Sequence, residues 1–488
     1  MEILDLPVIA YEDRAAPALT ALGFQRAQGD PVYRDAAGHS FAQRFTGAAA
    51  PKALARTFGC QMNEADSESI RGQLQQLGYA DTSDEAEADL IFINTCAIRG
   101  SAAEHALGEV GRLKALKQER PAMLLAVCGC LTQMPETVRH LERYAPHVDL
   151  VFGTHNLHEL PQLLHRAYVG EQQVVDVWRQ SDAVIEDLPA LRAPGARAWV
   201  NIIYGCDKYC TYCIVPYTRG KERSRRPGDI LAEVEDLAAR GYTEITLLGQ
   251  NVNSYGKDLA GGYDFADLLR DLDRVPGIRW IRYMTSHPRD YSRKLVDAVA
   301  ASTKVCEHFH LPVQAGSDRV LRWMNRGYTR DSYLELVRAV RAAIPHAVIT
   351  TDIIVGFPRE TEADFAETLS LAEAVGYDNA FTFMYSPRDG TPAARWADPV
   401  PLEVKKERLQ RLNERVYAIA RAKNEAMVGQ TCEVLIEGPS KKDPAVYTAR
   451  TRGNKLVHVP GRPGLENAFA TARIRSAHTW TLDGELTP

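Results

Sequence analysis

Short, continuous apolar runs alternate with amphipathic segments between residues 52 and 170. A continuous apolar run is typical of a parallel strand that is covered on both faces, and an apolar period near 3.6 residues is typical of a helix. The alternation therefore predicts an α/β domain with a parallel sheet. The expected strands are 54–58, 90–94, 123–127 and 150–152, and the expected helices are 66–77, 101–118, 135–142 and one from residue 157.

The same alternation starts again at residue 198, after a partly polar crossing segment at 172–195. The expected strands are 198–203, 244–248, 279–284, 308–312, 348–355 and 380–385. The expected helices are 229–239, 265–272, 292–298, 317–324, 331–343 and 361–375, and a basic helix follows at 403–427. Six strands with right-handed crossover helices are fewer than the eight of a full barrel, and chemistry is expected at their carboxyl ends.

The two ends of the chain have different patterns. Residues 1–51 give a weak signal, with a helix expected at 16–22, strands at 30–34 and 40–45, and a linker at 47–51. We treat them as an extension of unknown role. After residue 429 short alternating runs predict strands at 432–437, 446–451, 455–459 and 470–476, which suit a small β-barrel. The expected domains are thus 52–170, 192–428 and 429–488.

Composition narrows the class of protein. A chain of 488 residues with 45% hydrophobic and 25% charged residues is typical of a globular protein of two to four domains. The N-terminus lacks a signal-peptide pattern, and no segment approaches the ~18 apolar residues of a membrane span. We expect a cytoplasmic protein without a membrane partner, in which the nine cysteines bind metal or act in catalysis. The net charge of −5 means that RNA binding must depend on local basic patches.

Three of the cysteines, Cys206, Cys210 and Cys213, lie within eight residues. One loop with this spacing can wrap three thiolates around a single centre, whereas a disulfide would leave the third thiol alone. Structural zinc needs four ligands, and no fourth Cys or His follows at a suitable offset. Three thiolates on a four-iron cluster leave one iron open to substrate. The spacing favours an iron–sulfur site, with zinc or a chance group of thiols as alternatives.

A second set of cysteines follows three successive strands of the first domain. Cys60, Cys96 and Cys130 come just after the expected strands. Because the carboxyl ends of parallel strands meet at one edge of a sheet, the three thiolates can converge there. The alternative is three separate buried thiols, which are common. Cys128 competes with Cys130, but it lies inside or at the end of the strand, so Cys130 is the better candidate.

The stretch 204–225, Tyr-Gly-Cys-Asp-Lys-Tyr-Cys-Thr-Tyr-Cys-Ile-Val-Pro-Tyr-Thr-Arg-Gly-Lys-Glu-Arg-Ser-Arg, resembles the radical S-adenosylmethionine enzymes. Within them it is most similar to the methylthiotransferases, in particular those that form 2-methylthio-N6-isopentenyladenosine in tRNA. The stretches 57–63, 94–99 and 129–133 resemble the three cysteine motifs of the methylthiotransferase N-terminal domain, and 429–488 resembles the RNA-binding TRAM barrel. The resemblance covers residues 52–488.

This resemblance implies a partial (β/α)6 barrel for 192–428 and two [4Fe–4S] clusters, held by Cys60, Cys96 and Cys130 and by Cys206, Cys210 and Cys213. In the family one S-adenosylmethionine methylates a sulfur on the first cluster, and a second is cleaved at the other cluster to a radical. The implied product is a methylthio group at carbon 2 of N6-isopentenyladenosine, at position 37 beside the anticodon. Two sister activities, on threonylcarbamoyl-adenosine in tRNA and on a ribosomal-protein aspartate, remain alternatives, as does an iron–sulfur RNA-binding sensor without enzyme activity.

Further candidate residues lie in the loops after the strands of 192–428. The predicted S-adenosylmethionine contacts are Gln250, Ser286, Gln314 and Arg326. His287 is as consistent with a structural role as with a functional one. Two basic sets are candidate phosphate contacts, namely Arg219, Lys221, Arg223, Arg225 and Arg226, and Arg450, Arg452, Lys455, Arg473 and Arg475. The expected partners are the tRNA anticodon stem-loop and proteins that donate electrons and sulfur, and the chain is expected to be a monomer.

Overall fold

The computed structural model describes residues 7–98, 100–170, 172–181 and 183–487, so residue 99 of the second cysteine motif and residues 1–6 lie outside the description. The chain forms two compact units. The first runs to Ala193 and also includes Tyr204–Asp207 and Ile214–Arg225. The second comprises Pro194–Ile203, Lys208–Cys213 and Arg226 onward. The cysteine loop predicted from the sequence therefore has residues in both units.

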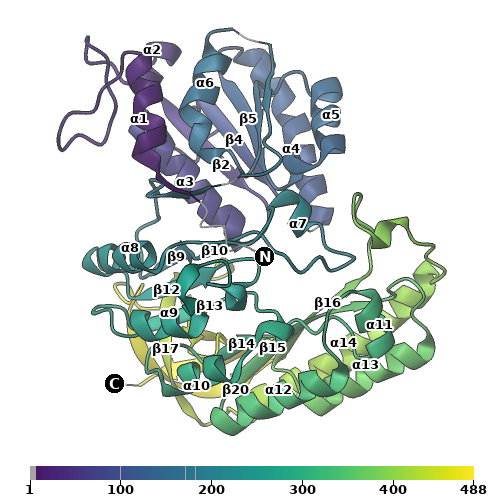
Figure 1. Cartoon of the computed structure of the whole chain (residues 1–488). Coiled ribbons are helices and arrows are strands. Elements are labelled where there is room, and N and C mark those ends of the chain that lie inside the picture. The colour runs from purple at the N-terminus through teal and green to yellow at the C-terminus, as the bar shows by residue number, and fades with distance from the viewer. Residues whose placement is uncertain (1–6, 99, 171, 182, 488) are drawn as a thin grey trace. The chain divides into compact units, whose positions relative to one another are not determined.

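The first unit is built on a six-stranded parallel sheet with the order β3-β2-β4-β5-β6-β7 (Figure 1). Its strands are β2 (Lys52–Thr57), β3 (Ala80–Asp81), β4 (Leu90–Thr95), β5 (Leu124–Gly129), β6 (Leu150–Phe152) and β7 (Val174–Asp176). The helices are α3 (Gln61–Gln76), α4 (Gly100–Glu119), η1 (Leu131–Gln133), α5 (Pro135–Tyr144), η2 (Leu157–Glu159) and α6 (Leu160–Tyr168). Helices α3 and α6 pack on one face and α4 and α5 on the other, which confirms the predicted α/β domain.

The N-terminal segment is part of this unit. It forms β1 (Val8–Ala10), α1 (Tyr11–Ala21) and α2 (Phe41–Thr46), and β1 pairs with β8 (Val184–Glu186). The strand predicted at 40–45 is wrong, because Ser40 and Gln43 form a capping box that starts a helix there. The strand predicted at 30–34 is also absent, since Arg34 makes only isolated bridges to Gln25 and Ser40.

The second unit contains the six parallel strands that the sequence predicts. They are β9 (Arg197–Asn201), β12 (Glu244–Leu248), β13 (Trp280–Tyr283), β14 (His308–His310), β15 (Val348–Val355) and β16 (Asn379–Met384), and β10 (Ile203–Tyr204) follows β9. They form two sheets, β13-β12-β9 and β14-β15-β16, and a parallel bridge from Ile281 to Val305 leads from one sheet to the other. A six-stranded α/β fold short of a closed barrel is therefore present.

Helices cover one face of these six strands. The helices are α8 (Pro227–Ala239), α9 (Phe265–Leu272), α10 (Arg293–Ala301), α11 (Asp318–Trp323), α12 (Arg330–Ala343) and α13 (Glu362–Val375). Short elements in the second unit's connecting loops are η3 (Val252–Ser254), η4 (Ala260–Gly262), η5 (Pro288–Asp290) and η6 (Ala393–Arg395). Two further short elements, α7 (Val215–Thr218) and β11 (Arg223–Ser224), belong to the first unit. Strand residues such as Ile245, Ile281 and Ile349 share one core with the helices. Side chains alternate along a strand, so in each strand the neighbours of these core residues line the opposite face of the sheet, which we call the inner face.

The chain ends in a closed five-stranded barrel with the order β17-β18-β19-β21-β20 (Figure 1). The strands are β17 (Thr431–Pro439), β18 (Val446–Thr451), β19 (Leu456–Pro460), β20 (Phe469–Ala477) and β21 (Thr481–Leu486), and α14 (Leu402–Glu425) precedes them. This barrel confirms the predicted class, although the sequence analysis missed β21. The turn between β18 and β19 packs on the second unit's sheet, where Arg282 donates to the carbonyl oxygens of Thr451 and Arg452.

Candidate functional site

Cys60, Cys96 and Cys130 lie just beyond the carboxyl ends of β2, β4 and β5, which are neighbours in the sheet. This confirms the placement predicted from the sequence. Cys60 immediately precedes α3, and Cys130 immediately precedes η1. The sulfur atoms of Cys60 and Cys130 lie 3.6 and 4.0 Å from the same atom, Asn63 Oδ1. Cys96 is fully buried, and Asn63 Nδ2 bonds the carbonyl oxygen of the residue before it, Thr95.

Two glycines allow the loops to come this close. Gly59 has φ of 138°, and a Cβ there would lie 2.6 Å from Cys96 Cβ. Gly129 has φ of 102°, and its Cβ would lie 2.3 Å from Asn94 Oδ1. Both φ values lie in the region that glycine adopts at little cost, and both contacts are too short for any larger residue. The cysteine loops therefore depend on glycine for conformation and for space.

A buried arginine, Arg219, lies beside the three thiols and bonds one of them. Its Nε atom donates a hydrogen bond to Cys130 Sγ over 3.0 Å, and its Nη2 atom is 2.6 Å from Asp66 Oδ2. The side chains of Arg219 and Asp66 are each only 5% exposed. Burial raises the pKa of the Cys130 thiol to about 12, and the charge of Arg219 acts in the opposite direction. The arginine thus supplies positive charge where burial alone would disfavour a thiolate.

The donor set fits an iron–sulfur cluster better than a single ion. Cys60 and Cys130 meet at Asn63, Cys96 lies beside Gly59, and the nearby Asp66 carboxylate is paired with Arg219. Three thiols thus lie close together, and soft thiolates suit iron–sulfur clusters. Among the described residues, no His, Cys, Asp or Glu side chains gather closely enough to hold one metal ion. A cubane holds its thiolates farther apart than one ion does, because each thiolate binds a different iron.

Cys128 is separated from this group. It lies within β5, and its side chain is fully buried in the core beneath α3 and α6. Its pKa is raised by burial. The prediction that Cys128 lies in the strand and Cys130 in the loop is therefore confirmed.

The second set of cysteines lies in a firmly held loop. In the first unit, the Cys206 N–H donates to the Gly220 carbonyl oxygen over 3.0 Å. In the second unit, the Thr211 N–H donates to the Met324 carbonyl oxygen, and Asn325 Nδ2 donates to the carbonyl oxygens of residues 208 and 209. Lys208, two residues before Cys210, forms a buried 2.8 Å ion pair with Asp290. Each part of the loop is thus fixed within its own unit.

Arg326 lies against the second of these cysteines. Its Nη1 atom donates to Cys210 Sγ over 3.2 Å and to the Tyr212 hydroxyl over 3.3 Å. Its Nη2 atom donates to the Pro312 carbonyl oxygen over 2.6 Å, just beyond β14. The guanidinium is buried, so its charge acts on the Cys210 sulfur at close range.

The other predicted cofactor contacts lie where expected, after β12, β13 and β14. The side-chain oxygens Ser286 Oγ and Gln314 Oε1 are buried without a hydrogen-bond partner among the described residues. Gln314 has φ of 74°, and its main chain bonds both Asp352 and Ile354 of β15. Gln250 follows β12. Buried polar atoms normally find partners, so the two oxygens suit a polar ligand.

His287 has a structural role in the described residues. Its N–H donates to the side-chain oxygens of Asn251 and Asn253, and its Nδ1 atom accepts from the Arg289 N–H. Burial lowers its pKa to about 2, with the charge of Arg326 acting in the same direction. The imidazole is therefore neutral and holds the loop after β13.

The basic run after the second cysteine set does not form the predicted phosphate track. Arg219 bonds Cys130, Arg223 donates to the carbonyl oxygens of Ser181 and Ala183, and Arg225 forms a buried ion pair with Glu186. Only Lys221 and Arg226 of this set are exposed. The run has the composition of an RNA-binding surface, but three of its five members stabilise the interior of the first unit.

The basic residues of the terminal barrel divide in the same way. Arg452 bonds Glu307 and two carbonyl oxygens beside β14, and Lys455 pairs with Asp378. Arg450 pairs with Glu437 over 2.6 Å. These three side chains bond groups within the second unit, which does not support their prediction as phosphate contacts. Arg473 and Arg475 are exposed on β20, Arg475 beside an equally exposed Glu485, and both stay candidates.

Within the described residues, no helix combines the length and the apolar character that crossing a membrane requires.

Three family models match the chain. Residues 52–153 match "Uncharacterized protein family UPF0004", residues 200–372 match the "Radical SAM superfamily", and residues 425–487 match the "TRAM domain". Among solved structures, the radical S-adenosylmethionine methyltransferase TsrM from Kitasatospora setae aligns with a TM-score of 0.51 and 13% identity, over 71% of this chain and 74% of that one. At this identity the match supports the fold alone.

Curated relatives are much more similar and nearly collinear with the chain. The tRNA-2-methylthio-N(6)-dimethylallyladenosine synthase of Geobacillus kaustophilus is 54% identical over 88% of this chain and 81% of its own length. The synthase of Symbiobacterium thermophilum is 54% identical over 91% and 96%, and that of Acetivibrio thermocellus is 50% identical over 88% and 90%. The chain therefore belongs to the family of the tRNA-2-methylthio-N(6)-dimethylallyladenosine synthases.

Proposed function

We propose that this protein replaces the hydrogen on carbon 2 of N6-dimethylallyladenosine, at position 37 of tRNA, with a methylthio group. Two molecules of S-adenosylmethionine are used, one as methyl donor and one as radical source. The names of the relatives support this substrate, as does their similarity over most of both chains. The single observation that carries the proposal is that the thiols of Cys60, Cys96 and Cys130 lie close together at the strand ends of the first unit's sheet. These cysteines are a different set from Cys206, Cys210 and Cys213, whose loop resembles that of the radical enzymes.

We assign one [4Fe–4S] cluster to Cys60, Cys96 and Cys130 and a second to Cys206, Cys210 and Cys213. When bound, the clusters supply the sulfur to be transferred and the electron that cleaves S-adenosylmethionine. A carbon–hydrogen bond on an aromatic ring has no acidic proton, so a radical route suits this substrate and a general base does not. The absence of an acid–base pair among the proposed residues is consistent with this chemistry.

The chain's own residues bind and orient these groups. Arg219 places positive charge on Cys130, and Asp66 and Asn63 hold Arg219 in position. Arg326 has the same relation to Cys210. Ser286 Oγ and Gln314 Oε1 are buried without a hydrogen-bond partner in the described part of the chain, and with Gln250 we propose these residues as polar contacts of S-adenosylmethionine. Arg326 was predicted to bind the carboxylate of S-adenosylmethionine, and we propose that it acts chiefly on Cys210, because its donors are already bound.

The anticodon stem-loop of tRNA is the proposed macromolecular partner, and the exposed Arg473 and Arg475 of the terminal barrel are its candidate phosphate contacts. Separate proteins would donate electrons and sulfur, and we propose that the chain works as a monomer. A cytoplasmic location is proposed because tRNA is modified there and reducing conditions keep thiols available for iron.

The direct test uses anaerobically reconstituted protein, S-adenosylmethionine, a reductant and a synthetic anticodon stem-loop that carries dimethylallyladenosine. We expect mass spectrometry of the digested RNA to find a nucleoside that has gained a methylthio group and lost one hydrogen. Stem-loops with threonylcarbamoyl-adenosine and a ribosomal-protein peptide serve as alternative substrates. Product on either of these, with none on the dimethylallyl RNA, would overturn the proposal.

The two cluster sites need a separate test. We would count clusters by Mössbauer spectroscopy in the wild type and in a variant with Cys206, Cys210 and Cys213 all replaced by alanine. Two four-iron clusters falling to one are expected. A fall from one cluster to none would remove Cys60, Cys96 and Cys130 from the metal assignment and with them the source of sulfur.

A further inference from the structure

Two phenylalanines on the last strand of the second unit are far more exposed than their chemistry favours. Phe381 and Phe383 of β16 are 50% and 44% exposed. They are two residues apart, so both side chains extend from the same face of the strand. Burying such a ring is favourable by roughly 1.5–3 kcal/mol, so two neighbouring rings left open to solvent suggest a surface that binds an apolar partner.

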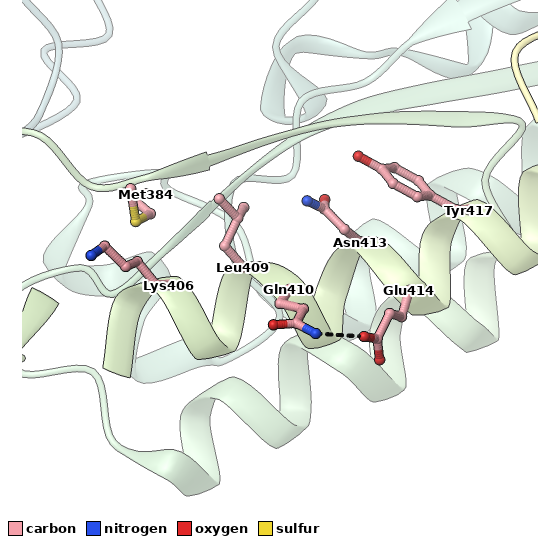
Figure 2. Close-up of a pocket in the computed structure, with 7 residues that line it drawn as sticks. All are labelled: Met384, Lys406, Leu409, Gln410, Asn413, Glu414 and Tyr417. Atoms are coloured by element: carbon pink, nitrogen blue, oxygen red, sulfur yellow. Dashed lines mark hydrogen bonds between the residues drawn. The ribbon is translucent and has the colours of Figure 1, made fainter. Parts of the chain in front are cut away.

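The two rings face away from the helices. Ala380, the residue before Phe381 on the same strand, belongs to the helix-packed core. Thr382 bonds Asn413 of α14, and Met384 lines a hollow on α14 with Leu409, Asn413 and Tyr417 (Figure 2). Because Thr382 and Met384 extend toward α14, Phe381 and Phe383 extend from the opposite side. The phenylalanines therefore belong to the inner face of the six strands.

Polar groups lie beside the first ring. In the sheet register Asp352 of β15 is directly opposite Phe381, and the ring of His310 on β14 meets the Phe381 ring edge-on at 6.0 Å. His310 Nε2 is 3.5 Å from Asp352 Oδ2, and its Nδ1 bonds Thr350. The Asp352 side chain is 29% exposed, so a carboxylate acceptor is accessible next to an aromatic surface.

The second ring lies closer to the proposed cofactor residues. Phe383 is opposite Ile354, whose N–H donates to the Gln314 carbonyl oxygen. Gln314 itself bridges to Ile353, the residue before Ile354, and its Oε1 atom has no hydrogen-bond partner among the described residues. At the other end of the strands the inner face is closed, because Gly453 of the β18–β19 turn packs against Val348. The rings are therefore on the open part of the inner face, toward the strand ends that carry Arg326 and Cys210.

We propose that Phe381, Phe383 and Asp352 bind the alkylated adenine of the substrate RNA and select for its dimethylallyl group. This inference rests on the proposed function, which supplies the occupant. An N6-alkylated adenine offers a flat ring for stacking, a branched apolar group and one remaining N6–H donor. The two phenyl rings match the first two features, and the Asp352 carboxylate matches the third.

The three residues have separate tasks in this site. Phe381 and Phe383 provide stacking and apolar contact, which every purine ring can use in part. The dimethylallyl group adds contact that unmodified adenine lacks, so the rings give a preference for alkylated RNA. Asp352 accepts a hydrogen bond from N6–H, with His310 holding the carboxylate in place. None of the three carries out a bond-forming step, so they determine specificity and position.

The test is the ratio of two dissociation constants. Fluorescence anisotropy with the anaerobically reconstituted enzyme would compare one stem-loop with dimethylallyladenosine and the same stem-loop with adenosine. We expect wild type to prefer the alkylated RNA, and Phe381→Ala and Phe383→Ala each to weaken its binding by about fivefold or more and to reduce the ratio. Phe383→Leu keeps an apolar group without the ring and should fall between. Tyr144→Ala removes an exposed ring from α5 of the other unit and should keep the wild-type ratio.

Two measurements, the ratio of the two dissociation constants and the methylthiolation activity, distinguish failure of this inference from failure of the proposed function. A wild type that methylthiolates the RNA, with Phe381→Ala and Phe383→Ala variants that keep the wild-type ratio and KM, overturns the site and leaves the function intact. A wild type without product on dimethylallyl RNA refutes the function, whatever the ratio. Because both rings are about half exposed, their loss should leave folding intact, which circular dichroism would check.

Discussion

Two arginines each donate a hydrogen bond to a cysteine sulfur at the proposed cluster sites. Arg219 bonds Cys130 in the first unit, and Arg326 bonds Cys210 in the second. Both guanidiniums are buried, where a charge acts more strongly than in water. A buried charge is tolerated only with partners, and each arginine finds one in a thiol that the proposed chemistry needs as thiolate. The positive charges of Arg219 and Arg326 thus suit negatively charged sulfur ligands.

Replacement of Arg219 should empty the first site. Arg219→Gln leaves Asp66 as a buried carboxylate without its cation, a loss of about 3–5 kcal/mol in comparable pairs. It also removes the donor to Cys130. We expect iron per chain after anaerobic reconstitution to fall to roughly half of the wild-type value, since each of two similar clusters holds the same amount. Colorimetric iron and sulfide assays measure this.

The control is Lys221→Gln, which removes an exposed charge from the same loop and should keep all the iron. Arg219→Lys keeps the charge but cannot bond Cys130 and Asp66 in one plane, so an intermediate iron content is expected. Full iron content in Arg219→Gln would mean that the arginine has no part in holding the first site.

The sequence predicted the cysteines of these sites but not their neighbours. Asn63 and Asp66 lie three residues apart on α3, so both face the thiols, and this helical spacing could have been noticed. Arg219 could not, because its bond to Cys130 spans 89 residues. A run of five basic residues looks alike in sequence whether its members point inward or outward, and burial alone separates them.

At the scale of elements, the N-terminal segment proved to be part of a core. Phe41 of α2 is fully buried and lies within 4.7–6.2 Å of the rings of Phe24, Phe45 and Tyr168. Tyr168 belongs to α6, and the same apolar cluster includes strand residues of the sheet. The segment that had no recognised role therefore covers one face of the first unit.

Phe41→Ala should accordingly destabilise the protein. A fully buried phenylalanine that is cut to alanine costs about 3–5 kcal/mol of unfolding free energy, because contacts are lost and a cavity remains. Urea unfolding followed by circular dichroism would measure the change, with Tyr144→Ala as an exposed aromatic control. A loss below ~1 kcal/mol, the size expected at a surface position, would contradict the packing described for this segment.

The turn between β18 and β19 joins the terminal barrel to the rest of the second unit. Arg452→Ala removes bonds to Glu307 and two carbonyl oxygens, and we expect a loss of about 2–3 kcal/mol without a change in the salt dependence of RNA binding. Arg473→Ala should instead affect RNA binding and not stability. It should keep stability and reduce the slope of log K against log salt by about one, as expected for one lost phosphate contact.

Thermal unfolding and RNA titrations at several salt concentrations distinguish the two variants. Unchanged stability in Arg452→Ala would contradict the anchoring role, and an unchanged salt slope in Arg473→Ala would remove that residue from the RNA-binding surface.

Long apolar strands were the easiest elements to predict, because burial on both faces leaves a clear sequence signal. The bounds of β12, β15 and α9 match the predicted ranges. The missed strand β21, with the sequence Thr-Leu-Asp-Gly-Glu-Leu, contains Asp and Gly, which are poor strand residues. Its conformation comes from pairing with β19 and β20, and closure of a barrel depends on such distant partners. The pairing of strands into two sheets was equally invisible in the local pattern.

At the scale of the whole molecule, buried neutral histidines couple stability to pH in both units. Burial lowers the pKa of His155 in the first unit and of His308 in the second to about 3. Below the ordinary value near 6.5, the unfolded chain binds a proton that the folded chain excludes. Each of these histidines therefore contributes stability that is complete above about pH 6.5 and is lost as the pH falls toward 3.

His308 offers the clearest test, because its Nε2 atom bonds Thr350 Oγ1 inside the second unit and it is not one of the proposed cluster or cofactor residues. About pH 5.5 is one pH unit below the pKa of histidine in the unfolded chain. At this pH, protonation of His308 in the unfolded chain should reduce the unfolding free energy by about 1.4 kcal/mol. His308→Gln can keep the bond to Thr350 but cannot titrate, so its stability should fall less than that of wild type between about pH 7 and about pH 5.5. Urea midpoints at both pH values measure the difference. His105→Gln, at an exposed position on α4, should follow wild type. If His308→Gln and wild type lost equal stability over this range, the imidazole would have to be protonated in the folded protein, and the closed end of the inner face would have to admit water.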